Sequence, residues 1–161
     1  MNSSRTKNSG FGLVEIVIGS AILSVSLLSI SNLFQLTLRA SSVTQSAVQG
    51  NYILEEGLEI TKLLRDTSYA TNILGMSTTV DYHYSWNGTT WVTTTVNTLI
   101  DGKFDRTITF ANVNRDLNGD IAATGTNDPN VRLATVSISW RDPIGTTTRS
   151  VQAYIVNIFG N

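Results

Sequence analysis

The chain contains no cysteine and only one histidine, His83. The absence of cysteine excludes a disulfide framework, a thiolate metal site and a lipid-modified amino-terminal cysteine. A zinc site made of histidines and a serine–histidine triad both lack parts. Neither G-x-x-x-x-G-K-[ST] nor G-x-G-x-x-G occurs, and no two acidic residues stand out as a hydrolytic pair. We therefore interpret the protein as a non-enzyme, without a resident cofactor.

Charge is scarce as well, at 14% of residues, with a formal net charge of -1. The distal part carries no stripe of Lys or Arg, so a duplex DNA footprint is not indicated. The scarcity is uneven along the chain. From Phe11 to Leu38 the only charged residue is Glu15, whereas Thr, Ser, Asn and Gly dominate from Ser77 onward. The apolar part is suited to lipid, and the polar part is suited to water.

The apolar run from Phe11 to Leu38 is long enough to cross a membrane. As a helix it would extend about 40 Å, against a hydrocarbon core of about 30 Å. It exceeds the 7 to 15 apolar residues, roughly, of a secretory signal peptide. Arg5 and Lys7 precede it, and the first ten residues contain no acid. By the positive-inside bias, we expect the amino terminus in the cytoplasm and the bulk of the chain outside it.

Glu15 lies inside this run, where a charge is expensive. An ionisable side chain at the centre of a membrane helix costs about 2.5 to 3.5 kcal/mol on insertion scales, so such carboxylates persist mainly with a partner. The segment itself contains no Lys or Arg, so the partner must come from elsewhere. A new amino terminus on a neighbouring chain, created by a cut just before Phe11, would supply one positive charge at the same depth.

The basic leader, Gly10, Phe11 and Leu13-Val14-Glu15 form the pattern G-F-x-L-V-E ahead of a long apolar stretch. This pattern resembles the class III signal of type IV prepilins and type II secretion pseudopilins. The resemblance implies that prepilin peptidase cuts between Gly10 and Phe11, that Phe11 becomes the methylated amino terminus, and that Glu15 pairs with a neighbour's amine during assembly.

The resemblance also implies partners: other pilin or pseudopilin subunits, the peptidase, membrane lipid and an assembly platform in the inner membrane. The chain departs from the family pattern at two points. Gly12 stands where members often carry Thr, and the helix lacks the interior Pro that often kinks major pilins. Both departures favour a minor rather than a major subunit.

Beyond the apolar run, helical periodicity continues in a more polar setting. Apolar residues fall on one side of residues 39–66, namely Ile53, Leu54, Leu58, Ile60 and Leu64, with acids and Lys62 opposite. We expect one helix to about Arg65, with Gly50 as a soft point and Gly57 where a sheet approaches closely. The predicted organisation is a leader at 1–10, a transmembrane and assembly helix at 11–38, an amphipathic continuation at 39–66 and a head at 67–161.

The head is predicted to be an antiparallel sheet, because Thr- and Val-rich strands follow one another without an intervening helix. Residues 80–86 and 89–96 alternate around Asn87-Gly88, which predicts a two-residue hairpin turn with Tyr84 opposite Trp91 and Tyr82 opposite Thr93. Further strands are expected at 104–113, 131–140 and 149–159. The fold class is therefore α+β, a long helix packed on an antiparallel sheet, as in pilins.

Three features of the head are candidate sites. Asp116, Asn118 and Asp120 present alternating oxygen ligands for calcium, but the sixth and twelfth positions of an EF-hand loop are Ile121 and Asn127, which favours a solvated turn. His83 is expected on a strand surface. The aromatic residues of the head could form an adhesive surface for sugar or single-stranded nucleic acid, although packing explains them more simply; they are Tyr82, Tyr84, Trp86, Trp91 and Trp140.

The sequence thus predicts a minor pilin or pseudopilin, held by one span in the cytoplasmic membrane with its amino terminus inside, and then assembled into an extracytoplasmic or cell-surface filament. Adhesion, motility, DNA uptake and secretion all use the same helix, so the head decides among them. The alternative is an uncleaved, membrane-tethered module whose head binds a surface polymer.

Overall fold

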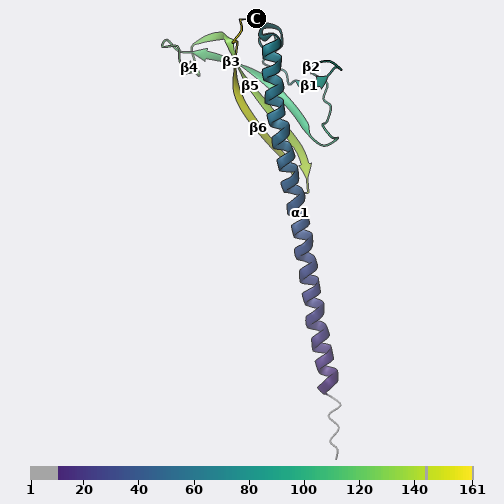
Figure 1. The fold of residues 1–161 in the computed structure, drawn as a ribbon. Coiled ribbons are helices and arrows are strands. Elements are labelled where there is room, and N and C mark those ends of the chain that lie inside the picture. Colours follow the sequence, from purple (N-terminus) through teal and green to yellow (C-terminus); the bar gives the residue numbers. More distant parts are fainter. Residues whose placement is uncertain (1–10, 144, 161) are drawn as a thin grey trace, which may run out of the picture. The chain divides into compact units, whose positions relative to one another are not determined.

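A computed structural model of the chain describes residues 11–143 and 145–160. Helix α1 (Phe11–Thr67) is followed by the π-helical turn η1 (Ala70–Leu74) and then only by strands. Figure 1 shows these elements. The chain divides within α1 into two compact units, one ending at Val43 and one starting at Thr44. The α+β class predicted from the sequence is confirmed, and α1 ends just beyond the expected Arg65.

The second unit contains a four-stranded antiparallel sheet in the order β4-β3-β5-β6 and a separate two-stranded hairpin, β1-β2. The strand bounds are β1 His83–Trp86, β2 Trp91–Thr94, β3 Asp105–Arg115, β4 Ile121–Ala122, β5 Thr126–Asp142 and β6 Gly145–Val156. β4 was not expected, and β5 and β6 both begin earlier than predicted. β5 begins earlier because Thr126 and Asn127 pair with the end of β3, and β6 begins earlier because Gly145 pairs with Asp142.

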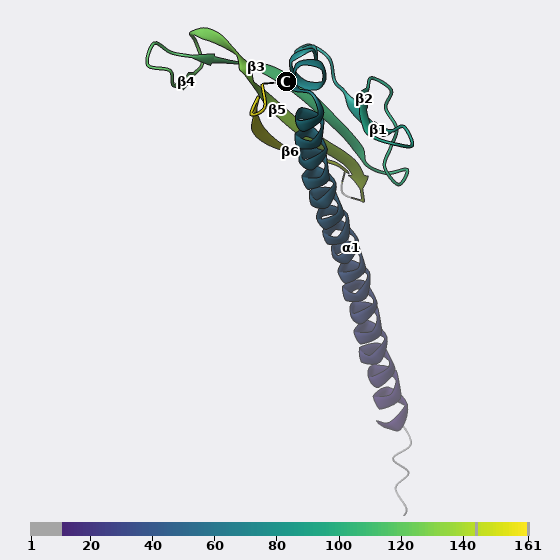
Figure 2. The same ribbon diagram turned by 45° about the horizontal axis from the view of Figure 1, so that its top comes forward.

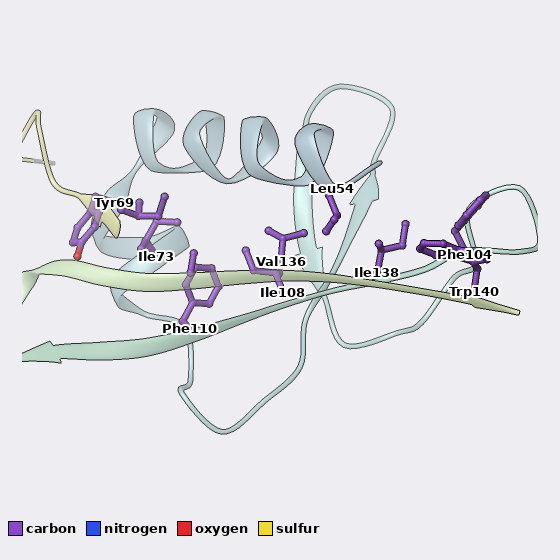
Figure 3. Close-up of a cluster of buried hydrophobic side chains, with 11 residues drawn as sticks. Leu54, Tyr69, Ile73, Phe104, Ile108, Phe110, Val136, Ile138 and Trp140 are labelled. Carbon is purple, nitrogen blue, oxygen red and sulfur yellow. The ribbon is translucent and has the colours of Figure 1, made fainter. Parts of the chain in front are cut away.

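Residues 44–67 of α1 lie against one face of this sheet, and the hairpin and β4 lie on opposite sides of that helical segment (Figures 1 and 2). The alternation of the strands explains the arrangement, since Ile108 and Phe110 of β3 share one buried face with Phe104, which directly precedes that strand. They belong to one buried cluster with Leu54 of the helix and with Val136 and Ile138 of β5 (Figure 3). Each fully buried side chain of this kind contributes about 1.5 to 3 kcal/mol.

The opposite face of the sheet, called the outer face below, is rich in hydroxyl groups. It carries Thr107 and Thr109 from β3, Thr135 and Ser137 from β5, and Tyr154 from β6. None of these five residues is buried. A one-sided antiparallel sheet of this kind buries its apolar face on the helix and leaves the polar face to solvent.

The predicted register of the β1-β2 hairpin is wrong. Trp86 pairs with Trp91 and Tyr84 with Thr93, so four residues rather than two connect the strands. The side chain of Asn87 is the reason, because its Oδ1 accepts hydrogen bonds from the backbone N–H groups of Thr89 and Thr90. An Asn-capped loop replaces the turn that needs two positive φ angles; of the pair Asn87-Gly88, only Gly88 has one.

Both glycines in the packed part of α1 mark close approaches. A Cβ added at Gly57 would lie 2.8 Å from Cγ1 of Val136, so the expectation of a close sheet there is confirmed. α1 continues through Gly50 without interruption, and the softness expected there stays a prediction. A Cβ at Gly50 would lie 2.8 Å from the ring of buried Trp140. The absence of a side chain at Gly50 makes room for the indole of Trp140.

We predict that Gly50→Ala destabilises the folded head. In an open helix the change would add about 1 kcal/mol of helix propensity, but forcing a methyl against a buried ring costs about 1 to 3 kcal/mol. Thermal unfolding followed by circular dichroism should show a melting temperature lower by a few degrees. Glu55→Ala, at an exposed position of the same helix, is the control and should change stability by no more than about 0.5 kcal/mol. A rise in the melting temperature for Gly50→Ala would contradict this packing.

Candidate functional site

Glu15 lies on the apolar part of α1, and its side chain is exposed in the single chain. Its neighbours Leu13, Val14 and Ile16 are exposed as well. Among the residues that the structure describes, no cation lies within ion-pair distance of Glu15. The helix therefore presents one carboxylate on an apolar surface that its own unit does not cover.

One helix of the described chain is long and apolar enough to cross a membrane, and its most apolar window is not buried at all. The polar hydroxyls within it are satisfied locally. Ser20, Ser24, Ser26 and Ser29 each donate a hydrogen bond to a carbonyl three or four residues earlier in the helix. Such back-bonding removes the cost of placing serine in lipid without requiring a second helix.

The structure describes the predicted cleavage site only in part. Gly10 lies outside the described residues. Phe11 is the first residue of α1, and its side chain is not described. The cleavage and methylation at this point therefore stay predictions from the sequence, as does the pairing of Glu15.

In the head, the structure reveals a buried charge that the sequence analysis missed. Arg106 lies on the core face of β3 between Phe104 and Ile108, with only 4% of its side chain exposed. Its Nη1 donates to the carboxylate of Glu56 at 2.6 Å and to the carbonyl oxygen of Ile53 at 3.2 Å. The alternation of β3 places Arg106 at a position where a buried apolar residue is expected. A charged residue at such a position was the signal in the sequence that could have indicated a buried ion pair.

Arg106 also joins the hairpin to the helix. Its guanidinium carbon lies 5.3 Å from the ring centroid of Tyr84 and 6.0 Å from that of Trp91. The hydroxyl of Tyr84 in turn lies 2.6 Å from Oγ1 of Thr61, which is buried on α1. Burial raises the pKa of Tyr84 well above its usual range, against the smaller opposing effects of Thr61 and Arg106.

The structure divides the five aromatic residues into two groups. Tyr82 and Trp140 belong to the interior, where they contact Phe110 and Phe104. Tyr84, Trp86 and Trp91 instead line a concavity of about 280 Å³ together with Glu56 and Arg106. The two indoles pack edge to face with ring centroids 5.7 Å apart. Part of the suggested aromatic surface is thus core, and part forms a pocket.

The prediction that His83 lies on a strand surface is wrong, because the residue is buried. Its Nδ1 is 2.9 Å from the carbonyl oxygen of Arg106, which accepts a hydrogen bond, and 3.7 Å from Oδ1 of Asp105. The preceding residue, Tyr82, forms a bridge with Ile108. This bridge holds the start of β1 against β3 and removes His83 from solvent.

The loop with the calcium candidates forms a capped turn. Oδ1 of Asp116 accepts hydrogen bonds from the backbone N–H groups of Asn118 and Asp120, with N···O distances of 2.8 and 3.0 Å. Among the described residues, no group of three acidic or histidine side chains is placed to hold a metal. The calcium assignment gains no support from this geometry, and the turn accounts for the Asp and Asn residues.

The base of that loop is closed by Arg115, whose Nη1 donates to the carbonyl oxygen of Gly119. Its Nε donates to the carboxylate of Asp128 at 2.6 Å. This hydrogen bond, aided by the backbone N–H of Asn130, holds the pKa of Asp128 below its usual value.

Comparison with protein-family models, with curated proteins and with solved structures gives no match.

We predict that alkaline pH destabilises the head through Tyr84. A folded-state pKa above the unfolded value of about 10 means that the folded state holds this proton more tightly, so the contribution is complete below about pH 10 and is lost as the pH rises. Urea unfolding at a series of pH values should show this loss, and Tyr84→Phe should show a smaller one. The variant also loses about 1 kcal/mol at neutral pH with the hydrogen bond to Thr61.

Tyr154→Phe, an exposed tyrosine on the outer face, is the matched control and should follow the wild-type pH dependence. An unchanged alkaline loss in Tyr84→Phe would assign the effect to other groups.

Proposed function

We propose that the chain is a minor pilin or pseudopilin, a structural subunit that is inserted in the membrane, cut between Gly10 and Phe11, and assembled into a filament through α1. The observation that carries the proposal is Glu15, one carboxylate on an otherwise uncharged apolar segment of helix. A plain anchor gains nothing from such a residue and is penalised for it by about 2.5 to 3.5 kcal/mol. A subunit that must find a neighbour gains a specific electrostatic contact.

The counter-charge comes from the neighbour's new amino terminus. Before cleavage, the positive charges of the leader are Arg5, Lys7 and the original terminus, all upstream of the apolar run. A cut after Gly10 creates an ammonium group directly at Phe11, four positions from Glu15 along the same helix. In a staggered neighbour, this ammonium reaches the depth of the Glu15 carboxylate. Because lipid offers no competing hydration, the pair is worth more there than at a protein surface.

The same helix serves as anchor and as assembly element. Its exposed apolar surface suits lipid before assembly and the helices of other subunits afterwards, since side-chain packing rather than hydrophobicity selects between these two environments. The back-bonded serines fit both environments, because their hydroxyls need no partner. The head, with its own core, stays folded throughout.

We expect cleavage to produce a mature terminus at Phe11. Co-expression of the full chain with a prepilin peptidase, followed by amino-terminal sequencing and intact mass measurement, should give a chain that begins at Phe11 and carries one additional methyl group. Gly10→Val should leave the leader attached. A terminus at Met1 in the presence of active peptidase would reject the proposal and favour the membrane-tethered binding module.

We expect neutralisation of Glu15 to impair assembly without affecting insertion. Glu15→Gln keeps the side-chain shape and removes the charge, and Glu15→Leu removes both. The amount of either variant in sheared filaments should fall at least tenfold, the factor that corresponds to about 1.4 kcal/mol. Membrane extraction with carbonate should retain both variants as fully as the wild type.

Ser24→Ala, in the same segment, is the control for Glu15. Its hydroxyl bonds only to its own helix, so incorporation should be unchanged. Normal incorporation of Glu15→Gln would show that the carboxylate has no partner and would remove the basis of the proposal.

A further inference from the structure

We infer that the head carries a binding site for a neutral saccharide in the concavity between the β1-β2 hairpin and α1. The site is formed by the aromatic side chain of Trp86 beside the ion pair of Glu56 and Arg106. This inference concerns the head alone and does not depend on filament assembly.

The aromatic part of the site is the half-exposed indole of Trp86, with 53% of the residue accessible. Its partner Trp91 packs against it edge to face, which fixes the ring at the end of the hairpin and lowers the entropy that a ligand would otherwise have to remove. The contact with Trp91 does not require Trp86 to be exposed, so the stability of the hairpin does not explain the exposure of this indole. Its exposure leaves a rigid apolar platform at the rim of a hollow.

The polar part of the site is the ion pair at its base. Glu56 is 49% exposed, and only its Oε2 bonds to Arg106, so Oε1 remains available as an acceptor. Arg106 bonds through Nη1 alone among the described residues, which leaves donors on Nη2 and Nε. Ser85 adds a hydroxyl to the lining. Charged donors and acceptors of this kind form hydrogen bonds stronger than neutral ones.

The charges and ring faces of the site favour a neutral ligand. An anion would have to compete with Glu56 for the guanidinium. A cation would find the faces of Tyr84 and Trp91 already occupied by Arg106. A pyranose ring suits what remains, because it has an apolar C–H face for the indole and a rim of hydroxyls that both donate and accept.

The size of the concavity and its content of basic residues narrow the choice of ligand further. A volume of about 280 Å³ lies just below the usual range of small-molecule sites, which starts at about 300 Å³, and suits one or two sugar units. Single-stranded nucleic acid needs a positively charged groove beside its stacking platform. The only basic residue among those that line this hollow is Arg106, and Glu56 neutralises it.

The test uses the full chain in a polyoxyethylene detergent, because glucoside and maltoside detergents would compete for the site. An array of immobilised neutral and acidic mono- and oligosaccharides, with oligothymidylate on the same surface, identifies what is retained. Titration with the free form of any retained sugar is followed by tryptophan fluorescence, to which Trp86 contributes as the most exposed indole. The expected result is saturable binding of at least one neutral saccharide that changes little between about 50 and 200 mM salt.

Variants connect such binding to the site. Trp86→Ala should weaken it at least tenfold, and Glu56→Gln should weaken it while circular dichroism confirms that the head is folded. Tyr154→Ala, which removes an equally exposed aromatic from the outer face, should bind as the wild type. The inference is overturned if the array retains no neutral saccharide, if Trp86→Ala binds normally, or if oligothymidylate displaces the sugar with strong salt dependence.

Discussion

The close approach of α1 to the sheet at Gly50 and Gly57 is the constraint on which the head depends. A side chain at either position would collide with Trp140 or Val136, so the distance between helix and sheet is set by the absence of two Cβ atoms. At that distance the apolar stripe around Leu54 meets the buried face of β3 and β5. Interiors are packed as densely as organic crystals, and a small change in this spacing would open voids or force side chains out of their rotamers.

The same spacing brings a charged side chain into the interface. Arg106 reaches from β3 past Gly57 to the carboxylate of Glu56, and its guanidinium lies beside two aromatic rings of the hairpin. Only the arginine of this pair is buried, and Glu56 is half-exposed, so the pair is weak evidence for stability. The role that we assign to Arg106 is to orient three elements toward one another. The proposed saccharide site is the open side of that junction, where Trp86 and Glu56 meet solvent.

The two halves of α1 meet opposite physical requirements with one secondary structure. In the first, the backbone satisfies its own polar groups, so the surface can be largely apolar on all sides, with Glu15 as the only charged residue between Phe11 and Leu38. In the second, only one stripe is buried, and the other side carries acids. The proposed filament subunit needs both properties, a surface exchangeable between lipid and protein and a folded head with its own core. The proposed function and the proposed ligand site thus concern different units of the chain.

Local features of the sequence were sufficient for the elements that depend on neighbouring residues. The extent of α1, the alternation of Phe104, Ile108 and Phe110, and the close sheet at Gly57 follow from periodicity and from the absence of a side chain. Tertiary structure alone decided the burial of His83 and the partners of Arg106. In both cases a contact between distant segments outweighed the local preference: the bridge from Tyr82 to Ile108 covered His83, and Glu56 lay 50 residues away from the arginine that it neutralises. The hairpin register was decided locally, because the side chain of Asn87 capped its own loop in place of the two-residue turn. Periodicity reports which face of an element is buried, but not what that face will meet.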